Sequence, residues 1–223
     1  MRKRLKEMCA RLLILLCGLT VAHFGVTLFL LADLGSDPFN VLVQGVHRAL
    51  DLAWLTHGNT HMALCLLIIA VLLFVDRRYI LPGTVVCMLC GGPIIDGFTA
   101  LLSPLFEKQP SLWMALLLQA AGCVILAAGM TVVIKSGAGT GPNDLVAVVL
   151  SDKLHRSFGI VRLLVDGAFV LAGFLLGGSV GLGTIVCVVL VGPVAGFFLP
   201  HSEGLVRRLL GRMGIRQEDT AGK

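Results

Sequence analysis

Gly83-Thr84-Val85-Val86-Cys87-Met88-Leu89-Cys90-Gly91-Gly92-Pro93 recurs one hundred residues later as Gly183-Thr184-Ile185-Val186-Cys187-Val188-Val189-Leu190-Val191-Gly192-Pro193. Six of the eleven positions are identical, and each copy carries its Gly-Pro step near the middle of an apolar run. A proline inside a helix removes a backbone hydrogen bond and crowds the carbonyl four residues back, so a kink or break is predicted at both steps. Paired interruptions of this kind point to a binding site in a repeat-built transporter.

The composition is that of an integral membrane protein. Of the 223 residues, 57% are hydrophobic and 14% are charged, and the mean hydropathy is +0.93. Soluble domains are about 25% charged, so this chain lacks the polar residues to cover a water-facing surface. The seven cysteines lie mostly within apolar runs and do not form an extracellular disulfide framework.

Six apolar runs are expected to cross the membrane. They cover residues 12–32, 60–75, 83–106, 112–134, 159–176 and 183–199. The basic leader 1–11 precedes a first run that is too long for a signal peptide and has no small-residue cleavage site, so we expect that span to be retained. Two further helical stretches, 39–50 and 143–154, are too short to cross.

The distribution of positive charge predicts the orientation. With six spans and the N-terminus inside, sixteen of the eighteen Lys and Arg residues lie on the cytoplasmic side, and only Arg48 and Lys108 lie outside. This bias follows the positive-inside rule. We therefore expect a multi-pass protein of the bacterial inner membrane with both termini in the cytoplasm. The net charge of +5 concerns topology, and no nucleic-acid partner is expected.

The repeat extends beyond the first motif. Gly35-Ser36-Asp37-Pro38 corresponds to Gly139-Thr140-Gly141-Pro142, each after the first span of its half. Each half then consists of a span, a Gly-x-x-Pro turn, a short re-entrant or interfacial helix, a span and a kinked span. Because three spans is an odd number, the second half must be inverted in the membrane. The expected fold is one all-α membrane domain (1–223), with repeat 1 about 11–106, repeat 2 about 111–200 and a basic tail 201–223.

The second turn is the predicted ligand-binding end of a helix. Helix N-termini carry unsatisfied N–H groups and partial positive charge, which favour anions. Gly139, Thr140 and Gly141, followed by Asn143, leave these groups bare, whereas Asp37 occupies the corresponding end in the first half. An ordinary capped helix start is the alternative interpretation.

Ionisable residues inside the spans are the other candidates, because such groups are costly in lipid. Asp96 is predicted to carry a coupling proton or cation, or else to lie near enough to the surface to be hydrated; Gly196 stands at its position in the second half. Arg162 and Asp166, four residues apart, form a salt bridge on one helix face, or else Arg162 contacts an anionic substrate while Asp166 holds it or assists the coupling.

The remaining motifs have structural alternatives. Gly92, Pro93, Gly192 and Pro193 are predicted hinges, or sites where helices pack closely. A histidine within the first span, His23, is interpreted as a packing residue rather than a proton relay. The Cys87-x-x-Cys90 pair is interpreted as small-residue packing, because the repeat retains only Cys187, and no metal or cofactor is expected.

Several of these motifs together resemble one family. They are Gly139-Thr140-Gly141-Pro142-Asn143-Asp144, Val161-Arg162, Gly177-Gly178-Ser179-Val180-Gly181-Leu182-Gly183-Thr184 and Gly192-Pro193. Stretches 33–41 and 83–96 are similar to the first-half counterpart, although Ser36-Asp37 departs from its pattern. Over nearly its whole length the chain thus resembles the YczE/YitT group of bacterial membrane proteins. The resemblance implies a small multi-span inner-membrane protein, often described as a transporter, and supplies no substrate.

The functional hypothesis is a secondary transporter of a small anionic or zwitterionic solute, with proton coupling and with a homodimer as a compatible assembly. A passive channel and a non-transporting scaffold or assembly partner are the alternatives. An intramembrane aspartyl hydrolase is disfavoured because its Gly-x-Gly-Asp signature is missing, and ATP-driven pumping is disfavoured because the sequence has no Walker-type loop. We expect no enzymatic activity.

Overall fold

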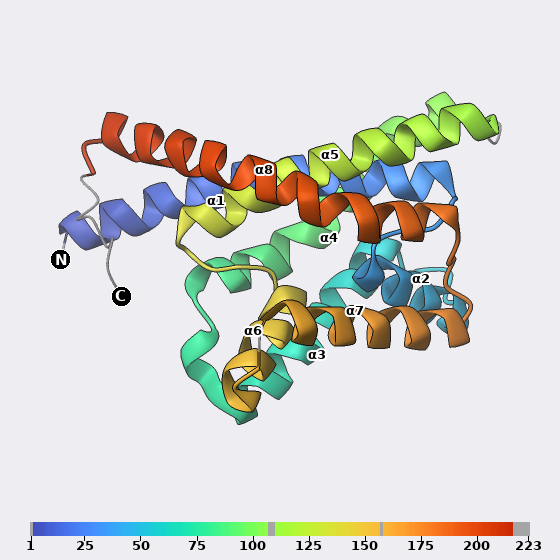
Figure 1. Cartoon of the computed structure of the whole chain (residues 1–223), viewed down its shortest axis with the longest axis horizontal. Coiled ribbons are helices and arrows are strands. Elements are labelled where there is room, and N and C mark those ends of the chain that lie inside the picture. Colours follow the sequence, from blue (N-terminus) through green and yellow to red (C-terminus); the bar gives the residue numbers. More distant parts are fainter. Residues whose placement is uncertain (1, 107–109, 157, 216–223) are drawn as a thin grey trace.

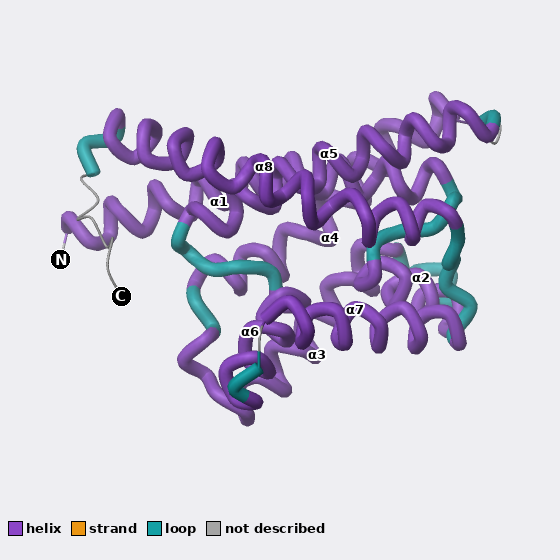
Figure 2. Tube along the Cα trace, in the orientation of Figure 1, coloured by secondary structure: helices purple, strands orange, loops and turns teal. Residues whose placement is uncertain are grey.

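The computed structural model describes residues 2–106, 110–156 and 158–215, and its regular elements are all helices (Figures 1 and 2). The α-helices are α1 (Arg2–Ala32), α2 (Pro38–Leu50), α3 (His57–Asp76), α4 (Pro82–Leu102), α5 (Leu112–Ser136), α6 (Pro142–Leu154), α7 (Phe158–Leu175) and α8 (Leu182–Arg212). Two short 3-10 helices, η1 (Arg77–Tyr79) and η2 (Ser103–Phe106), extend α3 and α4.

The all-helical, multi-pass membrane architecture is confirmed. Five helical segments of the described chain are long and apolar enough to cross a bilayer. They are Arg4–Ala32, His57–Tyr79, Pro82–Phe106, Leu112–Ser136 and Leu182–Arg212. The remaining predicted span, 159–176, forms α7, which is not among the five, so the count of six stays a prediction.

The long helices pack through glycines. α1 lies along α5, with α4 against α1 and α8 against α5 (Figure 1). A Cβ atom on Gly25 of α1 would lie 2.6 Å from the backbone nitrogen of Leu126, and one on Gly129 of α5 would overlap the backbone of Ala22. Small residues at both crossings therefore allow the two backbones to approach closely, as is typical of membrane helices.

The shorter helices pack across the two halves. α2 lies on α7, where a Cβ on Gly45 would overlap the carbonyl oxygen of Gly173. α6 lies on α3 in the corresponding way, but there the side chains of Leu72, Leu145 and Val149 fill the interface. Figure 1 shows α6 toward the end that carries both termini and α2 toward the other end.

The predicted breaks at the Gly-Pro steps do not occur. α4 continues through Pro93, and α8 continues through Pro193 and Pro200. A proline removes only one helical hydrogen bond, and the tight packing on one side of α4 holds that helix together. The hinge role of these residues is therefore not supported by an unwound segment, and it stays a prediction.

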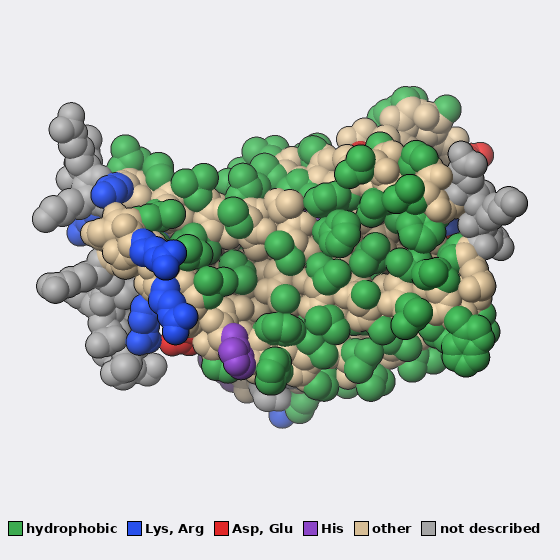
Figure 3. Space-filling model, turned by 90° about the horizontal axis from the view of Figure 1, so that it is seen from above, with side chains coloured by type: hydrophobic (Ala, Val, Ile, Leu, Met, Phe, Trp, Pro, Cys, Tyr) green, Lys and Arg blue, Asp and Glu red, His purple; other side chains and the backbone are tan. Residues whose placement is uncertain are grey.

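The surface separates apolar from basic regions. On the face shown in Figure 3, hydrophobic side chains are spread along the length of the molecule, and Lys and Arg gather at the end where the termini lie. There α1 and α8 pack together through Ala10, Ile14, Val206 and Leu210. Lys108, which was predicted to lie outside, and Lys223 of the tail fall outside the described residues.

Candidate functional site

Each Gly-x-x-Pro turn is held by the opposite half of the chain. The Gly83 N–H, at the start of α4, donates a hydrogen bond to the Ala138 carbonyl in the second turn region (2.9 Å). The Gly183 N–H, at the start of α8, donates to the Leu34 carbonyl in the first (2.7 Å). The repeated Gly-Thr motif thus anchors the turn that precedes the other half's short helix.

A glycine is required in each turn, at Gly35 (φ +105°) and Gly139 (φ +143°). These are conformations that residues with a side chain rarely adopt. A Cβ on Gly35 would lie 2.5 Å from the Thr184 hydroxyl oxygen, and one on Gly139 would lie 2.7 Å from the Thr84 nitrogen. Backbone strain and close contact therefore select the same residue type at both positions.

Both short helices begin at a cavity of about 1320 Å³. Proline stands in the first turn of each, as predicted, and the side chain of Asp37 caps α2, whereas Gly141 provides no side-chain cap for α6. Faces of α1, α3, α4, α5, α7 and α8 complete the wall, which is mostly apolar. Most of the site residues predicted from sequence line the cavity. They are Gly139, Thr140, Gly141, Asn143 and Arg162 of the predicted ligand site, the predicted coupling residue Asp166 and the predicted hinge residue Gly192.

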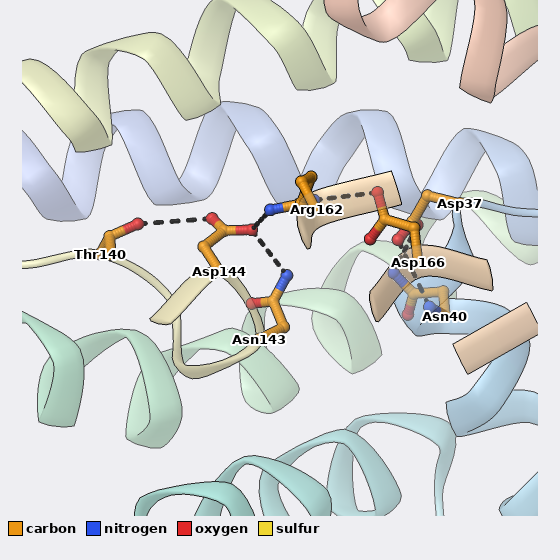
Figure 4. A network of polar contacts seen from close by, with 7 residues as sticks. All are labelled: Asp37, Asn40, Thr140, Asn143, Asp144, Arg162 and Asp166. Atoms are coloured by element: carbon orange, nitrogen blue, oxygen red, sulfur yellow. Dashed lines mark hydrogen bonds and ion pairs between the residues drawn. The ribbon is translucent and has the colours of Figure 1, made fainter. Parts of the chain in front are cut away.

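One polar cluster interrupts the apolar wall (Figure 4). Arg162 donates from Nη1 to Asp144 Oδ1 (2.6 Å) and from Nε to Asp166 Oδ2 (2.9 Å). Asp144 also accepts from Asn143 Nδ2 (3.0 Å) and from the Thr140 hydroxyl (3.3 Å). The contact between Arg162 and Asp166 predicted from their spacing is present. The guanidinium is therefore already bound by two carboxylates.

Asp37 faces this cluster from the start of α2 (Figure 4). Its carboxylate accepts hydrogen bonds from Asn40 Nδ2 (2.7 Å) and the Asn40 backbone N–H (3.3 Å). Desolvation by burial raises the pKa of Asp37, the nearby negative charge of Asp166 raises it further, and the Asn40 hydrogen bonds and Arg162 oppose the shift. Asp37 thus sits where it retains a proton more readily than an ordinary aspartate.

The sequence prediction missed part of this cluster. Asp144 was quoted within the family motif, but its role as a partner of Arg162 was not identified. The spacing between the two residues spans a helix and a loop, so local periodicity carries no signal for the contact. The cavity wall contains three carboxylates and one guanidinium as its Asp, Glu, Lys and Arg side chains. Its formal charge is therefore negative when the carboxylates are ionised.

Two buried histidines also border the cavity. The rings of His23 and His61 meet edge to face, with centroids 5.5 Å apart. Neither ring nitrogen of His23 has a hydrogen-bond partner among the described residues, and the same holds for Nδ1 of His61. His61 is on α3 of the first half and Arg162 is on α7 of the second, so these two helices bring different polar groups to the cavity.

Asp96 does not line the cavity. It accepts hydrogen bonds from the Gly58 backbone N–H (2.9 Å) and the Thr56 hydroxyl (2.5 Å), at the start of α3. These contacts explain an aspartate in α4 as a cap for the neighbouring helix. Pro93 and Pro193 likewise lie outside the cavity lining, as does Gly92.

Sequence comparisons place the chain among membrane proteins. The profile described as "Family of unknown function (DUF6198)" matches residues 9–200. A Bacillus subtilis relative named "Uncharacterized membrane protein YczE" is 26% identical over 208 residues, 93% of this chain and 94% of the relative. A Haemophilus influenzae "Uncharacterized protein" is 28% identical over 188 residues, 83% of this chain and 82% of the relative. The predicted resemblance to YczE is thereby confirmed, and no solved structure matches.

Proposed function

The chain belongs to the DUF6198 family, and we propose that this member is a secondary transporter of a small zwitterionic or cationic solute across the bacterial inner membrane. The observation that carries the proposal is the cavity at which the starts of α2 and α6 meet the cluster around Arg162 (Figure 4). Transporters built from repeats place their substrate site in this way, between the halves and beside short or interrupted helices.

An inverted repeat of two three-span halves is part of the proposal, with both termini in the cytoplasm. Its support is the reciprocity of the contacts. The hydrogen bond from Gly83 to Ala138 has a counterpart from Gly183 to Leu34, with corresponding residues exchanged between the halves. The crossing of α2 with α7 likewise has a counterpart in that of α6 with α3. Such exchange is expected when two copies of one unit are related by a two-fold axis in the membrane plane.

The charges of the site revise the expected class of solute. An anion requires a free positive group, but Arg162 is engaged by Asp144 and Asp166 at 2.6 and 2.9 Å. The remaining carboxylate, Asp37, faces the same space. A ligand with an ammonium group meets this arrangement without displacing the salt bridges, so a cationic or zwitterionic solute is favoured over a simple anion.

Coupling to protons is assigned to the cavity carboxylates. Asp37 and Asp166 lie close enough for their charges to interact, so binding of one proton or one ammonium group at this pair reduces their mutual repulsion. Asp96, the coupling residue predicted from sequence, instead serves the packing of α3 on α4 in this proposal.

The test is uptake into proteoliposomes with an imposed proton gradient. Radiolabelled lysine, alanine and succinate serve as cationic, zwitterionic and anionic probes. We expect saturable uptake of at least one of the first two, with little uptake of succinate. Asp166→Asn and Arg162→Ala are expected to lower uptake about tenfold or more, because each removes a charged hydrogen-bond partner at the site.

Asp96→Asn provides the matched control, since it neutralises an aspartate that lies outside the cavity. Its uptake per folded molecule is expected to equal that of the parent protein. Uptake that neither saturates nor responds to the proton gradient identifies a passive channel. An absence of uptake of all three probes, combined with thermal stability that none of them changes, overturns transport of a small hydrophilic solute and favours the scaffold.

A further inference from the structure

The two halves differ in how closely their last two long helices pack, α3 with α4 in the first half and α7 with α8 in the second. In the first half α3 packs on α4: a Cβ on Gly58 would overlap the Gly92 carbonyl, and Asp96 binds the start of α3. In the second half α7 and α8 make little contact among the described residues. At Gly192 and Gly196, no described atom of another element lies within 4 Å of a built Cβ.

The space between α7 and α8 belongs to the cavity. Both helices contribute apolar side chains to its wall. In the protein by itself, without lipid, many of these side chains are more than half exposed. They are Leu163 (65%), Leu171 (61%), Phe174 (59%), Ile185 (61%), Val188 (53%) and Val189 (61%). Arg162 and Asp166 lie on the same helix as the first three, so the apolar groove is continuous with the polar cluster.

A site with a charged end and an apolar end favours a ligand that has a charged head and an apolar tail. One end of the site offers three carboxylates against one guanidinium, and the other offers aliphatic and aromatic surface that faces the lipid region. An ammonium group complements the first end, and a hydrocarbon chain complements the second. A small hydrophilic solute leaves the groove unused, whereas a neutral lipid leaves the excess carboxylate unmatched.

We propose that the natural ligand is a cationic amphiphile, with an amine head bound at Asp37 and Asp166 and an apolar tail between α7 and α8, and that it enters sideways from the bilayer. This inference rests on the proposed transport function and narrows its substrate class. The corresponding passage between α3 and α4 is closed by Gly58, Gly92 and Asp96, so entry is confined to the second half.

The test uses dodecylamine that carries a diazirine at the far end of its chain, added to the protein in phosphatidylcholine nanodiscs. After illumination, mass spectrometry is expected to find the label on α7 and α8, at the peptides that contain Leu171 and Val189. Unlabelled dodecylamine is expected to compete, and dodecanoate at the same concentration is not. Asp166→Asn is expected to weaken competition by dodecylamine about tenfold, because an ionic hydrogen bond is lost.

The repeat supplies a matched pair of blocking variants. Val189→Trp places a large ring in the groove, whereas Leu89→Trp adds the same ring at the corresponding position of α4, which is 53% exposed and outside the cavity lining. Both side chains point away from the packed interior, so folding is expected in each case, and size-exclusion chromatography checks it. Labelling is expected to fall at least several-fold in the first variant and to persist in the second.

Equal competition by dodecanoate overturns the inference, because the groove then takes any lipid regardless of its head group. Disulfide cross-linking of Val189→Cys between two copies under an added oxidant, with loss of probe labelling, also overturns it, since the groove is then a dimer interface. If the parent protein shows no specific labelling but takes up lysine with the proton gradient, the amphiphile ligand is refuted and the transport proposal is retained. Specific labelling without uptake of any probe or of dodecylamine refutes transport and retains the binding site.

Discussion

The α3–α4 pair and the α7–α8 pair stand at corresponding places in the two halves, and their sequences share the Gly-Thr and Gly-Pro steps. In the first pair Gly58 meets Gly92 and Asp96 caps α3. In the second pair the positions of Gly92 and Asp96 are held by Gly192 and Gly196, and α8 stands apart from α7. Shared glycines therefore permit close packing of two helices without enforcing it. The closed α3–α4 pair has the polar contact of Asp96 with the start of α3, and the open α7–α8 pair has no aspartate at that position.

The turns are where the halves are most alike, and substitution there is expected to have the largest effect. Gly35→Ala and Gly139→Ala are each expected to lower the free energy of unfolding by about 2–4 kcal/mol, since the backbone conformation costs about 1–3 kcal/mol and the clash with Thr184 or Thr84 adds to it. Unfolding in mixed micelles with increasing sodium dodecyl sulfate measures the change.

Equal losses in the two variants support the two-fold exchange of contacts between the halves. A loss confined to one variant contradicts it, because the reciprocal hydrogen bonds at Gly83 and Gly183 then do not have equivalent roles.

The Gly-Pro steps are expected to respond differently. Gly92→Ala forces a methyl group into the α3 backbone and is expected to cost about 1–3 kcal/mol, as overpacking does. Gly192→Ala meets open space and is expected to leave stability unchanged or slightly higher, since alanine is the better helix former. The same detergent unfolding experiment compares the two. A similar cost at both positions means that α7 and α8 pack as closely as α3 and α4, and the open groove is then refuted.

The aspartate that distinguishes the halves has a smaller expected effect. Asp96→Ala removes the side chain that binds Thr56 and the Gly58 N–H, and loss of such a cap costs about 0.5–2 kcal/mol. Hydrogen exchange is expected to accelerate at the start of α3 and not at the start of α7. Unchanged exchange with a loss of proton-driven uptake restores the coupling role that the sequence first indicated for Asp96.

Features that depend on local sequence are predictable, and contacts between distant helices are not. Apolar run lengths predict most of the helices, and the Gly-x-x-Pro pattern predicts both short helices because proline favours a helix start. The continuity of α4 and α8 through Pro93 and Pro193 was not predicted, although a proline removes only one helical hydrogen bond. The pairing of Asp144 with Arg162 and the capping role of Asp96 were not predicted either. Both join residues on different helices, and no local period encodes such contacts.

The starts of the short helices offer the smallest and most selective test, because Asp37 caps α2 while Gly141 stands in its place before α6. The raised pKa of Asp37 means that the folded protein retains a proton that the unfolded chain releases between the ordinary and the raised pKa. The contribution to stability is therefore full below the ordinary pKa of aspartate and is lost as the pH rises through the raised one.

Asp37→Asn preserves the cap and removes the ionisation, so we expect a shallower fall in stability over this range, measured by detergent unfolding at a series of pH values. Gly141→Asn is the control at the second helix and is expected to leave the pH dependence unchanged. If Asp37→Asn also leaves the slope unchanged, the carboxyl at the α2 start is ionised throughout, and the proton must then bind elsewhere in the cavity, with Asp166 as the next group to replace.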